Sequence, residues 1–290
     1  MQPDILIQTL INGVFTGGIY ALVSIGLTLI YGVMLIINFA HGEFLMLGMY
    51  ASYWAFTLAG IDPYLSIPLS AAVLFGTGAL IQLGLIQRIL TAHILMQILL
   101  LLGVSTLLTG LVQFFLGAQP LTLLMPYSSF GVRFAGLVFN LPRMIAFVAS
   151  LVIAGGLYLF LQRTKTGKAI RACAQSREAA QLVGINVKFI YMLTFGIGVA
   201  VTGVAGTLIS PSYPTTPTVG QLFSVTAFVV VVLGTMGNFI GALFGGLIIG
   251  IAEAFGGLLL GSDVKVIVSM MVFILVLLLR PQGLFGRAKT

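Results

Sequence analysis

The residues of this sequence that are best suited to chemistry are four polar side chains set in long apolar runs. Asn38, His41 and Glu43 form one cluster, and Glu253 stands alone in a second apolar run. A polar or ionisable group in such a run is costly in lipid and must face protein or water, so it often marks a path for a polar solute. The plainer alternatives are an interfacial turn at 38–43 and a Glu253 carboxyl that only hydrogen-bonds a neighbouring helix. The residues alone leave both open.

Other kinds of site lack the residues that they need. The sequence has two histidines and one cysteine, Cys173, so we expect no metal centre, no disulfide framework and no bound cofactor. A nucleotide-binding P-loop needs a glycine five positions before its Gly-Lys pair and a Ser or Thr after it. Here Gly167-Lys168 has Gln162 and Ala169 at those positions, so the P-loop is absent. No cluster of nucleophile, base and metal ligands is visible, and we expect the chain not to be an enzyme.

Composition places these residues in a membrane. Of 290 residues, 59% are hydrophobic and 7% are charged, against roughly 25% charged in an average soluble domain. The apolar runs are continuous rather than alternating, which favours helices over a barrel. We therefore predict an all-α polytopic membrane protein, with one transmembrane domain over residues 1–290 and eight or nine transmembrane helices. The expected spans are 8–30, 44–60, 65–86, 94–116, 144–162, 190–210, 222–236, 239–260 and 265–279.

The polar cluster also marks a break between two of these helices. One helix over residues 5–60 would be about 80 Å long at 1.5 Å per residue, against a bilayer core of about 30 Å. The chain must therefore break, and we predict a broken or re-entrant segment near 38–43. A helix that begins inside the bilayer directs amide groups and a partial positive charge at a route. Only Gly237 and Asn238 separate 222–236 from the next span, so eight spans with one re-entrant piece remain an alternative to nine.

Glycines recur at close spacing at the start of the 239–260 run. They are Gly237, Gly241, Gly245, Gly246 and Gly250. Small residues at such spacing let helices approach closely. We predict tight packing within the chain, with a seam between two copies as the alternative.

Basic residues predict the orientation. Six lie in the loop 163–188, whose one acid is Glu178, and three lie after residue 279. Loops rich in Lys and Arg stay in the cytoplasm, so both segments are predicted to be inside, with the N-terminus outside and the C-terminus inside. With nine spans Arg88 is inside as well, so ten of the 13 basic residues are cytoplasmic. This bias also explains the net charge of +7, so we expect no nucleic-acid partner.

The loop 163–188 is the second candidate site. Its segment 168–183 favours helix, because it has five alanines and no proline or glycine, and a glycine flanks it at each end. We predict one or two short helices at the membrane surface. An amphipathic surface helix that carries positive charge is the plainer interpretation. The functional interpretation is a helix that inserts into a groove of a cytoplasmic partner.

Part of this loop is similar to a known motif. Glu178-Ala179-Ala180, followed after three residues by Gly184, resembles the start of the EAA loop in permease subunits of ABC importers. The Ile-x-Leu-Pro that follows in that pattern is absent, which argues against the maltose-type permeases. The stretches that resemble the permeases of branched-chain amino acid importers are 17–50, 167–187, 241–255 and 277–287, which include the Asn-Phe-Ala-His-Gly-Glu run at 38–43.

The resemblance implies a function and a set of partners. The chain is expected to be the permease of an ATP-driven importer in a bacterial or archaeal plasma membrane, moving branched-chain or related amino acids. Two ABC ATPase subunits, a second permease subunit that is a paralogue, and an extracytoplasmic solute-binding protein are the implied partners, beside the lipid bilayer. In that family the EAA loop docks on the ATPase. The docking residues carried over are Gly167, Arg171, Arg177, Glu178, Ala179, Ala180 and Gly184.

Two further functions stay open from the sequence. A permease for urea or short amides would share the same architecture. An ion-coupled secondary amino acid transporter would use Glu253 or His41 in a proton relay, and the docking-type loop argues against it. The substrate itself, and whether the permease pairs with a second copy or a paralogue, are not encoded in any motif.

Overall fold

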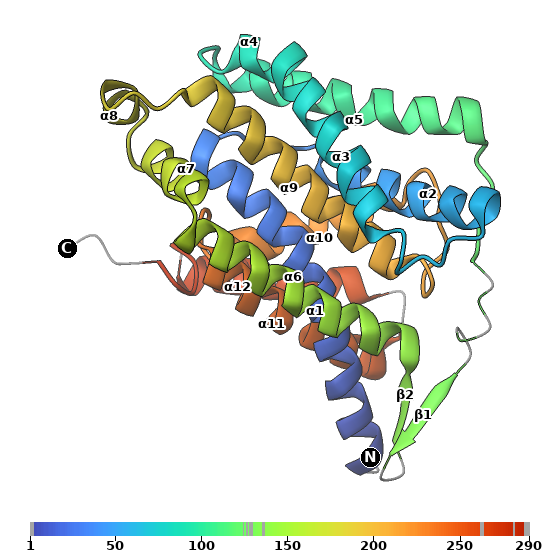
Figure 1. Cartoon of the computed structure of the whole chain (residues 1–290). Coiled ribbons are helices and arrows are strands. Elements are labelled where there is room, and N and C mark those ends of the chain that lie inside the picture. The colour runs from blue at the N-terminus through green and yellow to red at the C-terminus, as the bar shows by residue number, and fades with distance from the viewer. Residues whose placement is uncertain are drawn as a thin grey trace.

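The protein is a bundle of tilted helices in a computed structural model that describes residues 3–123, 125, 127, 130–134, 137–261, 264–280 and 282–286 (Figure 1). Its first half consists of α1 (Pro3–Met34), α2 (His41–Ala59), α3 (Ile67–Ile81), the π-helical turn η1 (Gln82–Ile86), α4 (Gln87–Ile89) and α5 (Ile94–Leu116). A hairpin of β1 (Gly131–Phe134) and β2 (Leu137–Asn140) precedes α6 (Leu141–Arg163). The remainder consists of α7 (Lys165–Gln175), α8 (Arg177–Leu182), α9 (Val187–Ile209), α10 (Val219–Leu233), α11 (Phe239–Leu260) and α12 (Lys265–Leu279).

The helical membrane class predicted from the sequence is confirmed. Each of the nine expected apolar segments falls on a helix, with α3, η1 and α4 forming one continuous stretch. Within the described residues, six helices are long and apolar enough to cross a membrane, and α10 and α12 are shorter apolar helices. The count of eight or nine spans therefore stays a prediction. The basic tail residues Arg287 and Lys289 lie outside the described residues.

Helix α1 forms the centre of the bundle. It contacts α11, α9, α6 and α10. Of the 18-residue apolar stretch with which α1 could cross a membrane, 78% is buried inside the protein, the same share as in α9. Glycines allow this close approach, because a Cβ added to Gly246 of α11 would overlap the backbone of Ala21 in α1. A Cβ on Gly17 would likewise lie 2.8 Å from the Cα of Leu247. The glycine spacing in α11 therefore serves packing within the chain, as predicted, because dispersion forces between close helices replace a hydrophobic effect in lipid.

Side-chain caps define where several helices begin. The amide oxygen of Asn238 accepts a hydrogen bond from Gly241 N at 3.0 Å, which starts α11 only a short distance after α10 ends. Thr164 caps α7 in the same way through Gly167 N at 2.9 Å. Such caps satisfy amide groups that have no partner within their own helix. The short connections that separate neighbouring helices are therefore encoded locally.

The segment between α5 and α6 is tied to the rest of the bundle at three points. Leu121 and Thr215 exchange backbone hydrogen bonds of 2.9 and 2.8 Å. The Tyr127 hydroxyl donates to Asp62 Oδ2 at 2.6 Å, and the side chain of Gln8 bonds both backbone groups of one β2 residue. Burial, and then the bond to Asp62, raise the pKa of Tyr127, so this phenol stays a donor at any ordinary pH. The segment is too short for a domain, and these bonds tie it to α1 and to the connections that follow α2 and α9.

Candidate transport site and docking helices

The predicted break lies where α1 ends and α2 begins. Leu35 has a positive φ of 56°, which ends α1, and the chain then runs without helix to His41. Asn38, His41 and Glu43 are buried, with exposed fractions of 0%, 0% and 1%. The start of α2 is thus enclosed by other helices rather than set in a surface turn. A polar group in this position must find its partners in the protein or in enclosed water.

His41 links three helices through one ring nitrogen. Its Nε2 lies 2.9 Å from the carbonyl oxygen of Val23 in α1 and 2.9 Å from the hydroxyl of Thr202 in α9. A carbonyl oxygen only accepts, so the hydrogen-bond pattern assigns the proton to Nε2 and a lone pair to Nδ1. That Nδ1 has no hydrogen-bond partner among the described residues.

The first amides of α2 are capped by another helix. Ser224 of α10 accepts a hydrogen bond from Gly42 N at 2.8 Å, and Asn38 Oδ1 accepts one from Ala40 N at 3.1 Å. Asn38 Nδ2 has no partner within the described part of the chain. The start of α2 is therefore held in place, and the unpaired donor Asn38 Nδ2 lies beside it.

Glu43 points away from these contacts, towards α5. Its Oε1 accepts a hydrogen bond from Ser105 at 2.8 Å, and its Oε2 is buried without a partner in the described residues. A carboxylate can accept several hydrogen bonds, so one unused oxygen leaves room for a cationic or donor group.

Glu253 is held separately by α1. Its Oε2 accepts a hydrogen bond from the Tyr20 hydroxyl at 2.7 Å. The Tyr20 ring packs edge-on against the ring of Phe223 in α10, with the two ring centroids 6.0 Å apart. Tyr20 lies one helical turn from Val23, the residue whose carbonyl binds His41. Glu253 is therefore connected to the 38–43 cluster through α1 and α10.

Sequence reasoning found the four polar residues but missed the groups that hold them. Those groups are Tyr20, Val23, Ser105, Thr202 and Ser224. Hydroxyl residues are common in membrane helices and usually bond their own backbone. No local signal distinguishes the few that reach another helix, so only the fold identifies them.

The loop 163–188 forms two helices, α7 and α8, as the sequence predicted. α7 packs on α6, α1 and α9. Its buried residues are Gly167, Ile170 and Cys173, which fall on one face. A Cβ on Gly167 would overlap the backbone of Leu161, so α7 lies directly against the end of α6. Arg171 of α7 bonds Gln162 at 2.6 Å.

Helix α8 projects from the bundle (Figure 1). Arg177, Glu178 and Ala179 are exposed, whereas Ala180 is buried. After Gln181, Leu182 and Val183 are apolar yet 89% and 75% exposed. Gly184 then has a φ of +83°, and a Cβ added there would meet no atom of the described chain within 4 Å. A short helix that presents apolar and charged side chains in this way is suited to contact another protein.

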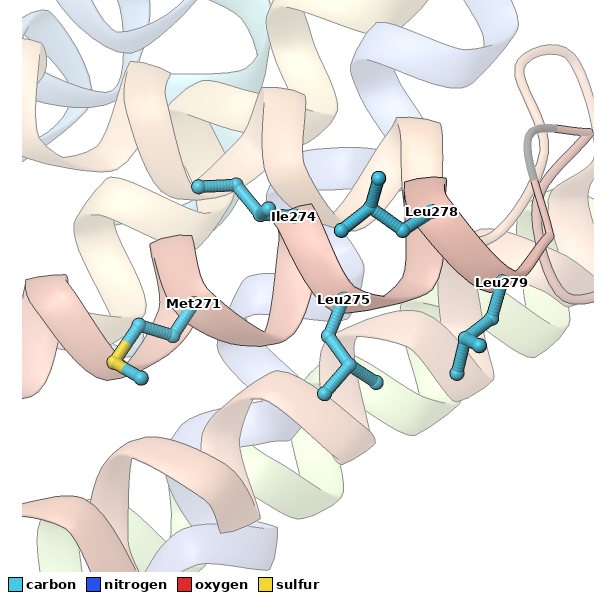
Figure 2. Close-up of a pocket in the computed structure, with 5 residues that line it drawn as sticks. All are labelled: Met271, Ile274, Leu275, Leu278 and Leu279. Carbon is cyan, nitrogen blue, oxygen red and sulfur yellow. The ribbon is translucent and has the colours of Figure 1, made fainter.

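A surface hollow on α12 differs from these sites in its chemistry. It is lined by Met271, Ile274, Leu275, Leu278 and Leu279 (Figure 2). All five side chains are apolar, so the hollow offers no partner to a charged or zwitterionic solute. The described residues also contain no group of three or more metal-ligating side chains.

Comparisons with known proteins identify close relatives. The chain matches the family described as branched-chain amino acid transport system / permease component over residues 9–277. It is 36% identical to the high-affinity branched-chain amino acid transport system permease protein BraD of Pseudomonas aeruginosa, over 99% of this chain and 98% of that protein. It is 34% identical to the corresponding protein LivH of Escherichia coli, over 97% and 96%. It is 32% identical to a probable branched-chain amino acid transport permease protein of Methanocaldococcus jannaschii, over 95% and 91%.

Proposed function

The chain belongs to the family of branched-chain amino acid transport permease components, and from this premise we propose that it moves branched-chain or related amino acids across a membrane as the permease subunit of an ATP-driven importer. The family match over residues 9–277 is the observation that carries the proposal. The protein is a multi-pass membrane protein of the plasma membrane, and we propose that ATP is hydrolysed by separate ATPase chains.

We propose four partner chains for the assembled importer. They are two ABC ATPase subunits, a second permease subunit that is a paralogue, and an extracytoplasmic solute-binding protein. Support comes from the family and from α7 and α8, whose residues Gly167, Arg171, Arg177, Glu178, Ala179, Ala180 and Gly184 we propose as the ATPase docking surface. ATP-driven closure of the ATPases would move this surface and switch the helix bundles between two arrangements.

Uptake measurements test the proposal directly. Vesicles that contain the assembled importer should accumulate leucine when ATP is present and the proton gradient is collapsed. Accumulation should stop when ATP is depleted while the gradient is kept. The reverse dependence would contradict the proposal and favour an ion-coupled transporter.

We propose that the N-terminus lies outside and the C-terminus inside, with α7 and α8 in the cytoplasm. A chain with Cys173→Ala should therefore react at Thr166→Cys only from the cytoplasmic side, and at Gln119→Cys only from the outer side. In a chain that keeps Cys173, this thiol should itself react little, because it is buried and burial raises its pKa, which disfavours the reactive thiolate. Labelling of Thr166→Cys from outside would contradict the orientation.

We propose that Asn38, His41, Glu43 and Glu253 lie beside the transport route. The support is the set of buried polar atoms in the 38–43 cluster that have no partner in the described residues: Asn38 Nδ2, His41 Nδ1 and Glu43 Oε2. Enclosed water or solute would supply the missing hydrogen bonds. Helix-end amides at the start of α2 add partial charge, which suits a zwitterion.

Paired substitutions at Glu253 and Tyr20 separate a route role from a packing role. Glu253→Gln keeps an oxygen that accepts from Tyr20 but loses the charge, so maximal leucine uptake should fall about tenfold with unchanged membrane levels. Tyr20→Phe removes the hydrogen bond and should lower uptake less than threefold. If Glu253→Gln transports normally and Tyr20→Phe does not, Glu253 only connects α11 to α1.

A further inference from the structure

Helix α5 lies at the edge of the bundle, with α2 as its principal neighbour (Figure 1). Its buried residues fall on one face and are Leu101, Val104, Thr109 and Val112. On the opposite face, Leu107 and Phe114 are 57% and 82% exposed. α5 therefore presents one defined face to α2 and the other to lipid or a partner.

Helix α2 also has two distinct faces. At 100° per residue, Glu43, Tyr50 and Trp54 lie on one side. Gly42 and Gly48 lie on the other side, against the backbones of Gly220 in α10 and Gly203 in α9. The hydrogen bond from Ser105 to Glu43 shows that the first side faces α5. We call the contact between these two faces the α2–α5 seam.

Helical spacing places four polar atoms on these two faces that are buried without a hydrogen-bond partner among the described residues. They are Glu43 Oε2, Tyr50 OH, Trp54 Nε1 and Thr109 Oγ1. Polar groups in a protein interior are nearly always bonded to protein or to ordered water. Four unpaired atoms along one seam therefore indicate a place that holds water or a polar ligand.

The chemistry of these atoms matches one class of ligand. Glu43 supplies a carboxylate oxygen, which binds an ammonium group, and Thr109 is a donor one turn further along α5 than Ser105. Tyr50 and Trp54 add donors two and three turns along α2, and Leu101 and Val112 supply apolar surface. A zwitterion with an aliphatic side chain needs an acceptor, donors and apolar walls together.

We propose that the α2–α5 seam is the intramembrane binding site for the transported amino acid, with its ammonium on Glu43 Oε2 and its carboxylate on the donors that begin at Thr109. This inference rests on the proposed function. It names the protein groups along the proposed transport route that bind the amino acid. Tyr50 and Trp54 continue the same path towards the end of α2 at Ala59. Ser105 is a positioning residue, because it holds the carboxylate of Glu43 through Oε1.

Cysteine accessibility tests whether the seam is hydrated. In the Cys173→Ala background of the assembled importer, Thr109→Cys should react with a small aqueous thiol reagent at least tenfold faster than Leu107→Cys on the opposite face of α5. Trapping the ATPases with a non-hydrolysable nucleotide should change the Thr109→Cys rate more than threefold. Equal, nucleotide-insensitive rates at the two positions overturn the proposal.

Conservative substitutions test the ligand groups. Glu43→Gln should lower maximal leucine uptake at least tenfold, and Glu43→Asp should restore part of it, at equal membrane levels and equal co-purification with the ATPases. Thr109→Val should lower uptake three- to tenfold. Its matched control is Thr106→Val, because Thr106 is exposed on the same helix and bonds only its own backbone at Leu102. Wild-type uptake by Glu43→Gln overturns the assignment of the ammonium.

The uptake experiment distinguishes a wrong transport function from a wrong binding site. If the unsubstituted complex shows no ATP-dependent uptake, the proposed function is wrong. If that complex transports leucine while the seam variants behave like Leu107→Cys and Thr106→Val, the function stands and the binding site lies elsewhere.

Discussion

Replacing Gly48 with valine is expected to leave little or no folded protein in the membrane. Gly48 lies where α2 crosses α9, and a Cβ there would overlap the backbone carbonyl of Gly203. The backbones of α2 and α9 cannot move aside at this crossing as a flexible side chain could. Overpacking typically costs about 1–3 kcal/mol and occasionally more, and here the two helices would have to separate along their length.

A matched glycine provides the control for that experiment. Among the described residues, no atom lies within 4 Å of the position that a Cβ on Gly76 of α3 would occupy, so Gly76→Val should accumulate and run as a single peak in detergent. Gly48→Val should give aggregate or no peak, as measured by size-exclusion fluorescence of a tagged protein. Normal peaks for both variants would show that the α2–α9 crossing tolerates a wider spacing.

Loss of ATPase association is the second large effect that we expect, from Glu178→Lys combined with Gly184→Trp. Glu178 is an exposed acid in a loop that is otherwise basic, and its reversal changes the charge that a partner meets. Gly184 has a φ of +83°, a conformation that a tryptophan adopts only with strain. The variant should insert normally, lose co-purification with the ATPases and transport less than a tenth of the wild-type amount.

Gly117→Trp is the matched control, because Gly117 also has a positive φ, of 80°, and no atom of the described residues lies within 4 Å of a Cβ added there. It follows α5, far along the chain from the docking loop. Gly117→Trp should keep ATPase association. If the double variant in the loop also co-purifies with the ATPases and transports normally, α8 is not part of the docking surface.

The sequence predicts more of the fold than of the site, for a physical reason. Continuous apolar runs locate the helices, because each span must satisfy its own backbone in lipid. The pairing of Tyr20 with Glu253 bridges 233 positions, and no local pattern encodes it. The burial of His41 also follows from neighbours on α1 and α9 rather than from its own segment.

For the loop 163–188, in contrast, local sequence signals predict the structure well. Alanines between two glycines predict its helices from local propensity alone. The role of Glu178 comes from resemblance, since an exposed acid has no signature of its own. Ser176, whose hydroxyl accepts from Ala179 N at 3.2 Å, divides the loop into α7 and α8. An N-cap serine is a recognisable sequence signal, so this division could have been predicted.

The central position of α1 has a consequence for biogenesis. α1 leaves the ribosome well before α11, and Tyr20 meets Glu253 only after 233 further residues have been made. At about 5–20 residues per second, this interval is roughly 10 to 50 seconds. During that time the glycine-lined face of α1 has no α11 to cover it. Until α11 has been made, lipid or other parts of the chain must cover this face, and the Tyr20 hydroxyl must find another hydrogen-bond partner.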